Sequence, residues 1–166
     1  MKKIALKKYF TNCFILILPI LAWNIIFMNQ LPKAFQPEVF WINIPNYIKY
    51  GENFSRILLF TLTVFMPLNI CTRIQIRGLR LYIFGILLYF ASWLFLIYLL
   101  ETQASSNLII FMAPAYTPIF WLTGIGLIGK SFYFNILYKK WFFISIAIIF
   151  LLFHNLHTYI IYLKTH

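Results

Sequence analysis

LYIFGILLYFASWLFLIYLL, residues 81–100, is a run of 20 residues that contains no charged side chain. A helix that crosses the hydrocarbon core of a bilayer needs about 20 predominantly apolar residues. This stretch therefore predicts a membrane-spanning helix, and its length decides the kind of fold to expect for the rest of the chain.

The composition of the whole chain agrees with this prediction. Of 166 residues, 63% are hydrophobic and only 10% are charged, whereas about 25% of residues are charged in soluble domains. A water-soluble domain of this size could not bury so much apolar surface. The sequence therefore predicts an all-α, polytopic integral membrane protein, built as a helical bundle.

Five segments are apolar enough to cross a membrane, and the second is the weakest. Only 16 residues separate Arg56 from Arg73, which is short for a core roughly 30 Å thick. Either Arg56 snorkels outward, or the helix begins near Pro45 and places Glu52 and Arg56 on one face. The expected single domain, residues 1–166, has spans at about 10–28, 55–71, 81–100, 108–129 and 141–163, with an outer loop at about 29–54.

Lysine and arginine predict the orientation. If the N-terminus is inside, ten of the 14 basic residues fall in inner segments and four in outer ones, as the positive-inside rule requires. MKKIALKK could begin a signal peptide, but the apolar run continues to Met28 without a clear cleavage site, so an uncleaved first helix is expected. Five spans with the N-terminus in and the C-terminus out suit a bacterial inner membrane.

TGIGLIGKS, residues 123–131, matches the phosphate-loop pattern G-x-x-x-x-G-K-[ST]. A working phosphate loop follows a strand, and its magnesium ion needs a further carboxylate. The chain has no Asp, and its three Glu fall on the opposite side of the predicted membrane. We therefore expect no nucleotide site. Small residues that let helices approach closely are the better interpretation, and these are Gly85, Ser92, Gly124, Gly126 and Gly129.

The histidine pair near the end of the chain is a candidate functional feature. His154 and His157 are three residues apart and share a helix face. They should lie at the height of three charged residues on other helices, so an outward-facing catalytic cluster would comprise Glu52, Arg56, Glu101, His154 and His157. The sequence favours a simpler interpretation, in which the histidines only reach the membrane interface. Two histidines alone do not make a metal site, so no metal is expected.

Pro114 and Pro118 interrupt the fourth span. Each proline removes a backbone donor, so the helix could break and line a substrate path. It could equally be kinked, with the freed groups satisfied by Thr117 or by neighbouring helices. The sequence favours the kink.

Little in the chain carries chemistry, and three functions stay open. The favoured one is a non-catalytic accessory, assembly or interaction component that acts through helix contacts. The second is a small transporter or channel-like subunit that uses a broken fourth helix, and the third is a membrane enzyme with an outward-facing His/Glu site. We expect no cofactor, nucleotide or nucleic acid. The partners expected are the lipid bilayer and either another membrane protein or a second copy of the chain.

Overall fold

The computed structural model describes residues 11–99, 107–134 and 137–165, and every regular element within these ranges is a helix. An isolated antiparallel bridge joins Asn12 to Pro67. The α-helices and the 3-10 helices, written η, are η1 (Cys13–Leu16), α2 (Leu18–Phe27), η2 (Met28–Gln30), η3 (Lys33–Phe35), α3 (Pro37–Phe40), α4 (Asn46–Phe65), α5 (Arg73–Leu99), α6 (Leu108–Tyr116), α7 (Pro118–Ile128) and α8 (Lys140–Thr165).

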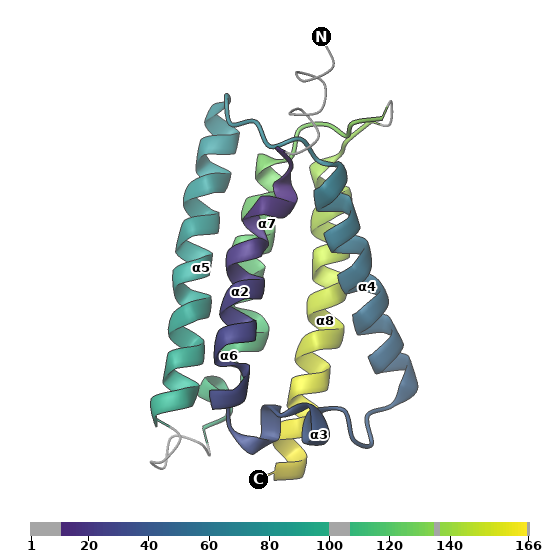
Figure 1. The fold of residues 1–166 in the computed structure, drawn as a ribbon. Coiled ribbons are helices and arrows are strands. Elements are labelled where there is room, and N and C mark those ends of the chain that lie inside the picture. Colours follow the sequence, from purple (N-terminus) through teal and green to yellow (C-terminus); the bar gives the residue numbers. More distant parts are fainter. Residues whose placement is uncertain (1–10, 100–106, 135–136, 166) are drawn as a thin grey trace.

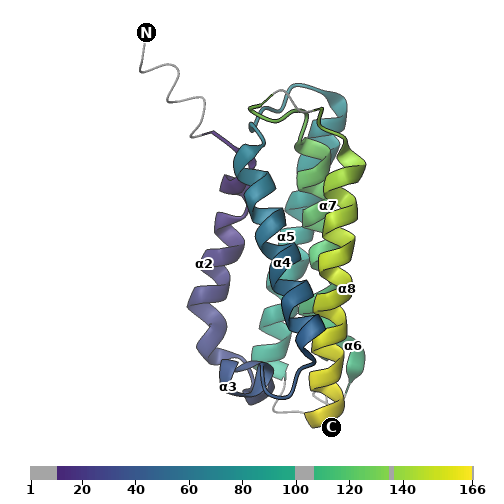
Figure 2. The same ribbon diagram turned by 90° about the vertical axis from the view of Figure 1, so that its right-hand side faces the viewer.

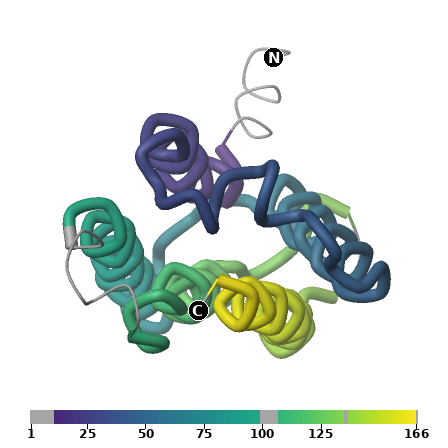
Figure 3. The backbone as a smooth tube through the Cα atoms, turned by 90° about the horizontal axis from the view of Figure 1, so that it is seen from below, coloured from purple at the N-terminus to yellow at the C-terminus, as the bar shows by residue number. Residues whose placement is uncertain are grey.

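The long helices lie side by side and form an elongated bundle (Figures 1 and 2). Seen along its axis, the bundle has the helices around a ring in the order α2, α4, α8, α6–α7 and α5 (Figure 3). α5 packs chiefly on α7, and α4 packs on α8. The end of α8 and the short helix α3 lie at one end of the bundle, which we call the C-terminal end (Figure 1). The other, basic end carries the exposed side chains of Arg73, Arg77, Arg80, Lys130 and Lys139.

Four helical segments of the described chain are long and apolar enough to cross a membrane. They are Cys13–Gln30, Arg73–Tyr98, Leu108–Ile128 and Lys140–Thr165. These segments correspond to the first, third, fourth and fifth spans that the sequence predicts. α4, which corresponds to the second, is not among them, because Lys49, Glu52 and Arg56 lower its apolar content.

α4 differs from the predicted span 55–71 at both ends. It begins at Asn46, directly after Pro45, and ends at Phe65. It ends early because Pro67 disfavours helical geometry in the residue before it, and Met66 is accordingly extended, with φ −93° and ψ 111°. The carbonyl of Met66 then accepts a hydrogen bond from the amide of Cys13 at 2.8 Å. The predicted outer loop 29–54 is shortened accordingly, because its last third is helical.

Glycines bring the backbones of α5 and α7 into close contact. A Cβ atom built on Gly124 would lie 2.6 Å from the amide nitrogen of Tyr82 and 2.8 Å from the carbonyl oxygen of Gly78. One built on Gly85 would overlap the backbone of Trp121. Because these neighbours are backbone atoms, the two helices could not hold this separation with larger residues at the same positions.

The other small residues named from the sequence have different surroundings. Gly126 faces Phe143 on α8, where an added Cβ would lie 3.0 Å from the ring. Gly129 ends α7 against the side chains of Met66 and Tyr138. Ser92 is buried, but its hydroxyl donates to the carbonyl of Tyr89 within α5 at 2.6 Å. Ser92 therefore fills space in the bundle, and its hydroxyl makes no hydrogen bond to a second helix among the described residues.

The junction of α6 and α7 is a kink with helical geometry. Thr117, the residue between the two helices, has φ −59° and ψ −27°. Its amide and its hydroxyl both donate to the carbonyl of Ala113, at 3.1 and 2.8 Å. Pro118 can follow directly because a helix tolerates proline in its first turn. The chain between Pro114 and Pro118 is therefore not unwound.

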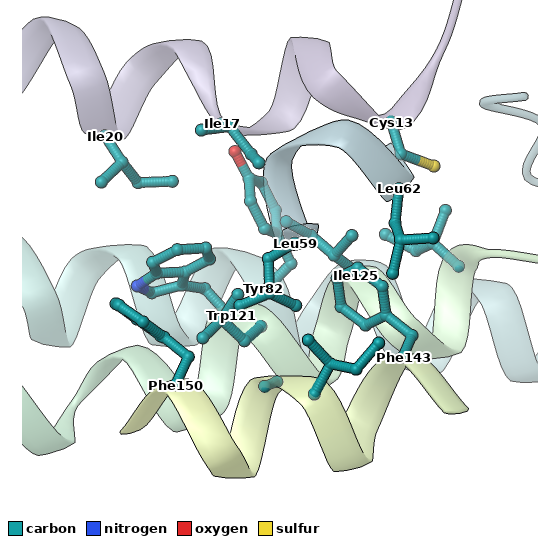
Figure 4. Packing of buried hydrophobic residues seen from close by; sticks show 14 of the residues in the cluster. Cys13, Ile17, Ile20, Leu59, Leu62, Tyr82, Trp121, Ile125, Phe143 and Phe150 are labelled. Carbon is teal, nitrogen blue, oxygen red and sulfur yellow. The ribbon is translucent and has the colours of Figure 1, made fainter. Parts of the chain in front are cut away.

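The core nearer the basic end is closely packed. Cys13 and Ile17 meet Leu62 of α4, Ile125 of α7 and Phe143 of α8 in one cluster (Figure 4). The hydroxyl of Tyr82 on α5 donates to the carbonyl of Leu16 at 2.7 Å, which ties α5 to the first helix. These contacts join the first helix, α4, α5, α7 and α8 near the basic end.

Candidate functional site

The candidate site lies in the half of the bundle toward the C-terminal end, and it centres on Glu52. The buried residues of α4 recur at intervals of three and four, which places them on one helix face toward α8. Glu52 occupies this face between Ile48 and Leu59, and its side chain has no exposed surface. A carboxylate is rarely buried so completely unless it is paired, so its partners decide what the site can do.

Glu52 has three side-chain partners, and we call these four residues the Glu52 cluster. Arg56, one turn later on α4, donates to Oε1 of Glu52. Nδ1 of His154 lies 3.1 Å from the same oxygen, and Nδ1 of His157 lies 2.6 Å from Oε2. The cluster thus joins α4 to α8, and its histidines lie 102 and 105 residues beyond Glu52 in the chain.

His157 is as fully enclosed as Glu52. Its side chain has no exposed surface, and its second ring nitrogen, Nε2, lies 2.8 Å from the carbonyl oxygen of Phe40. The rings of Phe40 and Trp41 pack on the imidazole, with centroids 4.1 and 4.7 Å away. His157 therefore connects Glu52 to the segment around α3.

His154 and Arg56 are the members of the cluster that are partly exposed, by 21% and 33% of their side chains. The imidazole of His154 stacks on the ring of Phe150 with an interplanar angle of 10°. Because its Nδ1 is held on Glu52, its Nε2 is directed to the other side of the ring. Both side chains line a cavity between the helices.

This cavity, which we call the chamber, has a volume of about 380 Å³. It lies between α2, α4, α5, α6–α7 and α8, and the segment with Phe40 and Trp41 contributes to its wall at the C-terminal end. Most of its wall is apolar, with contributions that include Ile20, Leu59, Leu96, Trp121 and Phe150. Pro114 and Pro118 also line the chamber. The helix therefore forms part of the chamber wall while Thr117 keeps its hydrogen bonds to Ala113.

Further polar groups of the chamber wall lie opposite the cluster. Asn24 of α2 accepts a hydrogen bond from the hydroxyl of Tyr89 on α5 at 2.8 Å, and both residues line the chamber. The indole N–H of Trp121 is buried and has no hydrogen-bond partner among the described residues. In Figure 4 this nitrogen lies on the side of Ile20 and Phe150, two other wall residues. A buried donor without an acceptor costs about 1–3 kcal/mol, which a ligand with an acceptor would offset.

Three of the four other residues expected around Glu52 are thus brought to it, namely Arg56, His154 and His157. Glu101, the fifth residue of the predicted cluster, lies outside the described residues. The tyrosine and asparagine of the wall, the unpaired indole and the carbonyl of Phe40 were not predicted from the sequence. A polar pair such as Asn24 and Tyr89 on different apolar helices could have been noticed, but a backbone carbonyl leaves no sequence signal.

No group of three His, Cys, Asp or Glu side chains within residues 11–99, 107–134 and 137–165 is arranged to hold a metal ion. In the cluster both histidines direct Nδ1 to separate oxygens of one carboxylate, and Nε2 of His157 lies on the carbonyl of Phe40.

The phosphate-loop pattern has a different setting from the one that phosphate binding needs. Gly124 and Gly126 lie inside α7, and Gly129 follows its last residue. The pattern therefore stands at the C-terminal end of a helix, where the helix dipole attracts cations and repels anions. A phosphate loop instead presents the N-terminus of a helix. Gly124 and Gly126 are explained by their contacts with α5 and α8, and Gly129 by its contacts with Met66 and Tyr138.

Comparison with known proteins adds no function to this geometry. No protein-family model, curated protein or solved structure matches the chain. The function is therefore argued from the chamber and the Glu52 cluster.

Proposed function

We propose that the chain is a multi-pass protein of the cell membrane that crosses it five times, and that α4 is the additional span. Its 20 residues extend about 30 Å, the thickness of a hydrocarbon core. Glu52 faces the bundle, whereas the outer face of α4 carries large apolar side chains such as Phe54 and Ile57, which are 70% and 65% exposed. Of the charges that weaken the apolar signal of α4, Glu52 is thus turned away from lipid.

In this arrangement the N-terminus is inside and the C-terminus is outside. The exposed arginines and lysines of the basic end support this orientation, because short loops rich in these residues stay in the cytoplasm. The Glu52 cluster and the chamber then lie in the outer half of the membrane. The short loops and the lysine-rich start of the chain favour a bacterial inner membrane.

Within the membrane the protein acts as a non-catalytic component that holds a hydrophobic ligand in the chamber. The observation that carries this proposal is the chamber itself, since about 380 Å³ falls in the range of small-molecule sites, roughly 300–1,000 Å³. A bundle that acted only through helix contacts would have no use for a void of this size, because protein interiors are close-packed. The proposed function is non-catalytic, as the sequence favours, but it depends on the interior of the bundle and not on the outer surfaces of its helices.

Native mass spectrometry of the protein, released from detergent, tests this proposal. We expect a hydrophobic small molecule to remain bound to the wild-type protein. Ala115→Leu fills part of the chamber wall, where Ala115 is 1% exposed, and it should reduce the bound fraction. Ala91→Leu, on the lipid-facing side of α5, is the matched control. Equal occupancy of both variants, or a wild-type chain that retains no molecule and takes up no Nile red, would contradict the proposal.

A second candidate function is a membrane enzyme, and the position of His154 favours it. An imidazole whose Nδ1 is held by a buried carboxylate, and whose Nε2 faces a cavity, has the arrangement of a general base. It would act on the ligand in the chamber with water as the second reactant. If the wild-type protein chemically converts the bound molecule and the His154→Gln variant does not, the result supports the enzyme and contradicts non-catalytic binding.

A further inference from the structure

The hydrogen bonds of His157 fix the number of protons in the Glu52 cluster. The carbonyl oxygen of Phe40 can only accept, so Nε2 of His157 carries a hydrogen and donates to it. A neutral imidazole with hydrogen on Nε2 has only a lone pair on Nδ1. Nδ1 nevertheless lies 2.6 Å from Oε2 of Glu52, and two lone pairs do not approach to this distance without a proton between them.

One additional proton therefore lies between His157 and Glu52. If the proton is on Nδ1, His157 is an imidazolium beside an ionised Glu52. If it is on Oε2, Glu52 is a neutral acid beside a neutral His157. Arg56 is positively charged in both cases, and His154 is taken as neutral. With a neutral His154 the cluster carries a net charge of +1 with either position of the shared proton, and protonation of His154 raises this charge to +2.

Among the described residues, no second carboxylate forms an ion pair with this cluster, and Glu38 of α3 is exposed. Every ion pair among the described residues involves Glu52 itself. Lys49 and Lys164 lie toward the same end of the bundle, where they contact the ring of Trp41 and the carbonyls of Ile42 and Asn43. An uncompensated charge beside an apolar cavity is costly, and the partly exposed members of the cluster, Arg56 and His154, direct that charge to the chamber.

We infer that the chamber binds a single-chain amphipathic anion, such as a fatty-acid carboxylate or a lysophospholipid phosphate. This inference rests on the proposed ligand-binding function. The acidic group lies against Arg56 and His154, and the apolar chain extends along Leu21, Leu96 and Trp121. One chain suits the volume of the chamber better than two, and the anion supplies the missing negative charge of the cluster.

The groups of the wall would hold the acidic head by complementary hydrogen bonds. The guanidinium of Arg56 has five N–H donors and uses its NH2 group on Glu52, so donors remain for a carboxylate or a phosphate. His154 presents Nε2, which has no hydrogen bond to a described residue, and it donates from there when protonated. The indole N–H of Trp121 supplies a further donor deeper in the chamber.

Photolabelling of the full-length protein in nanodiscs tests the inference. The probes are a palmitic acid with a diazirine in its chain, its methyl ester, and a lysophosphatidic acid with the same chain. We expect the acid to label peptides that contain Leu21 or Leu96 at least about ten-fold more than the ester does, because hydrogen bonds to charged groups are the strong ones. Stronger labelling by the lysophosphatidic acid would identify phosphate as the preferred head group and would also support the inference.

The outcomes separate this inference from the function on which it rests. Equal labelling of the chamber by acid and ester would overturn the anion and leave the hydrophobic ligand intact. If none of the probes labels the chamber and all label the lipid-facing residues, such as Leu152 and Phe95, the ligand-binding function fails as well.

Variants test whether the cluster is the source of the preference. Arg56→Gln and His154→Gln should each reduce the preference for the acid to within about three-fold of the ester, while Arg56→Lys retains most of it. Lys49→Gln removes a positive charge from the same helix outside the chamber wall and serves as the control. Circular dichroism and size-exclusion profiles establish folding, and His154→Gln decides the question if Arg56→Gln does not fold. An unchanged preference in a folded His154→Gln or Arg56→Gln protein would refute the role assigned to that residue.

Discussion

Substituting Glu52 by Gln tests whether this residue holds the C-terminal half of the bundle together. The substitution keeps the size of the side chain and removes its charge. Glu52 and His157 have no exposed side-chain surface, so the variant leaves the positive charge of Arg56 and of the proton shared with His157 without its buried counter-charge. Breaking a fully buried pair in this way costs about 3–5 kcal/mol. Arg56 is 33% exposed and lines the chamber, and an ion pair with a partly exposed partner contributes about 0–1 kcal/mol where water reaches it.

The two estimates predict an order of stability that can be measured. The free energy of unfolding is obtained from SDS titrations in mixed micelles followed by far-UV circular dichroism. We expect Glu52→Gln to lose about 3–5 kcal/mol and Arg56→Gln about 1 kcal/mol or less. Glu38→Gln makes the same chemical change at an exposed position and should stay within about 0.5 kcal/mol of wild type. If Glu52→Gln were as stable as Glu38→Gln, the buried carboxylate would not support the fold.

Two further predictions concern contacts between helices, and a third concerns the orientation in the membrane. Gly124→Ala should lower the free energy of unfolding by about 1–3 kcal/mol, because its Cβ would lie 2.6 Å from the backbone of Tyr82. Gly126→Ala should lower it less, because the added Cβ meets the side chain of Phe143, which can move. Equal losses of stability in thermal unfolding would contradict the backbone contact. Asn155→Leu removes a 3.0 Å hydrogen bond from α8 to the carbonyl of Ala115. It should lower the free energy of unfolding by about 0.6 kcal/mol, measured by the same SDS titration. A loss above about 2 kcal/mol would contradict the assignment of this single hydrogen bond as the role of Asn155. Alkaline phosphatase fused after the C-terminus should be active and a fluorescent protein fused there should not, and the reverse result would exclude the N-in, C-out orientation.

The helical class of the protein could be predicted from the sequence because it follows from local composition. An uncharged run such as 81–100 can be satisfied by few structures other than an apolar helix, and four of the predicted spans have counterparts of spanning length. The bounds of α4 were harder to predict from the sequence. A hydropathy window counts Glu52 and Arg56 as unfavourable wherever they point, although Glu52 is turned into the bundle.

The contacts within the site needed the structure because they join distant parts of the chain. The spacing of His154 and His157 showed that they share a helix face, but the sequence could not show that this face meets Glu52 on α4. The position of Phe40 is still less visible, since its contribution is a backbone carbonyl that any residue would supply. The chamber depends on how far α2 stands from the other helices, and no residue pattern encodes that distance directly.

The long separation between Glu52 and its histidines has a consequence for biosynthesis. In the proposed five-span arrangement, α4 leaves the ribosome about 100 residues before His154 and His157 do. Until then, Arg56 is the member of the cluster that can accompany the carboxylate into lipid. Insertion of α4 is therefore completed late, when α8 arrives, and a nascent chain that stops after α7 should leave α4 at the membrane surface, where quality-control proteases can recognise it.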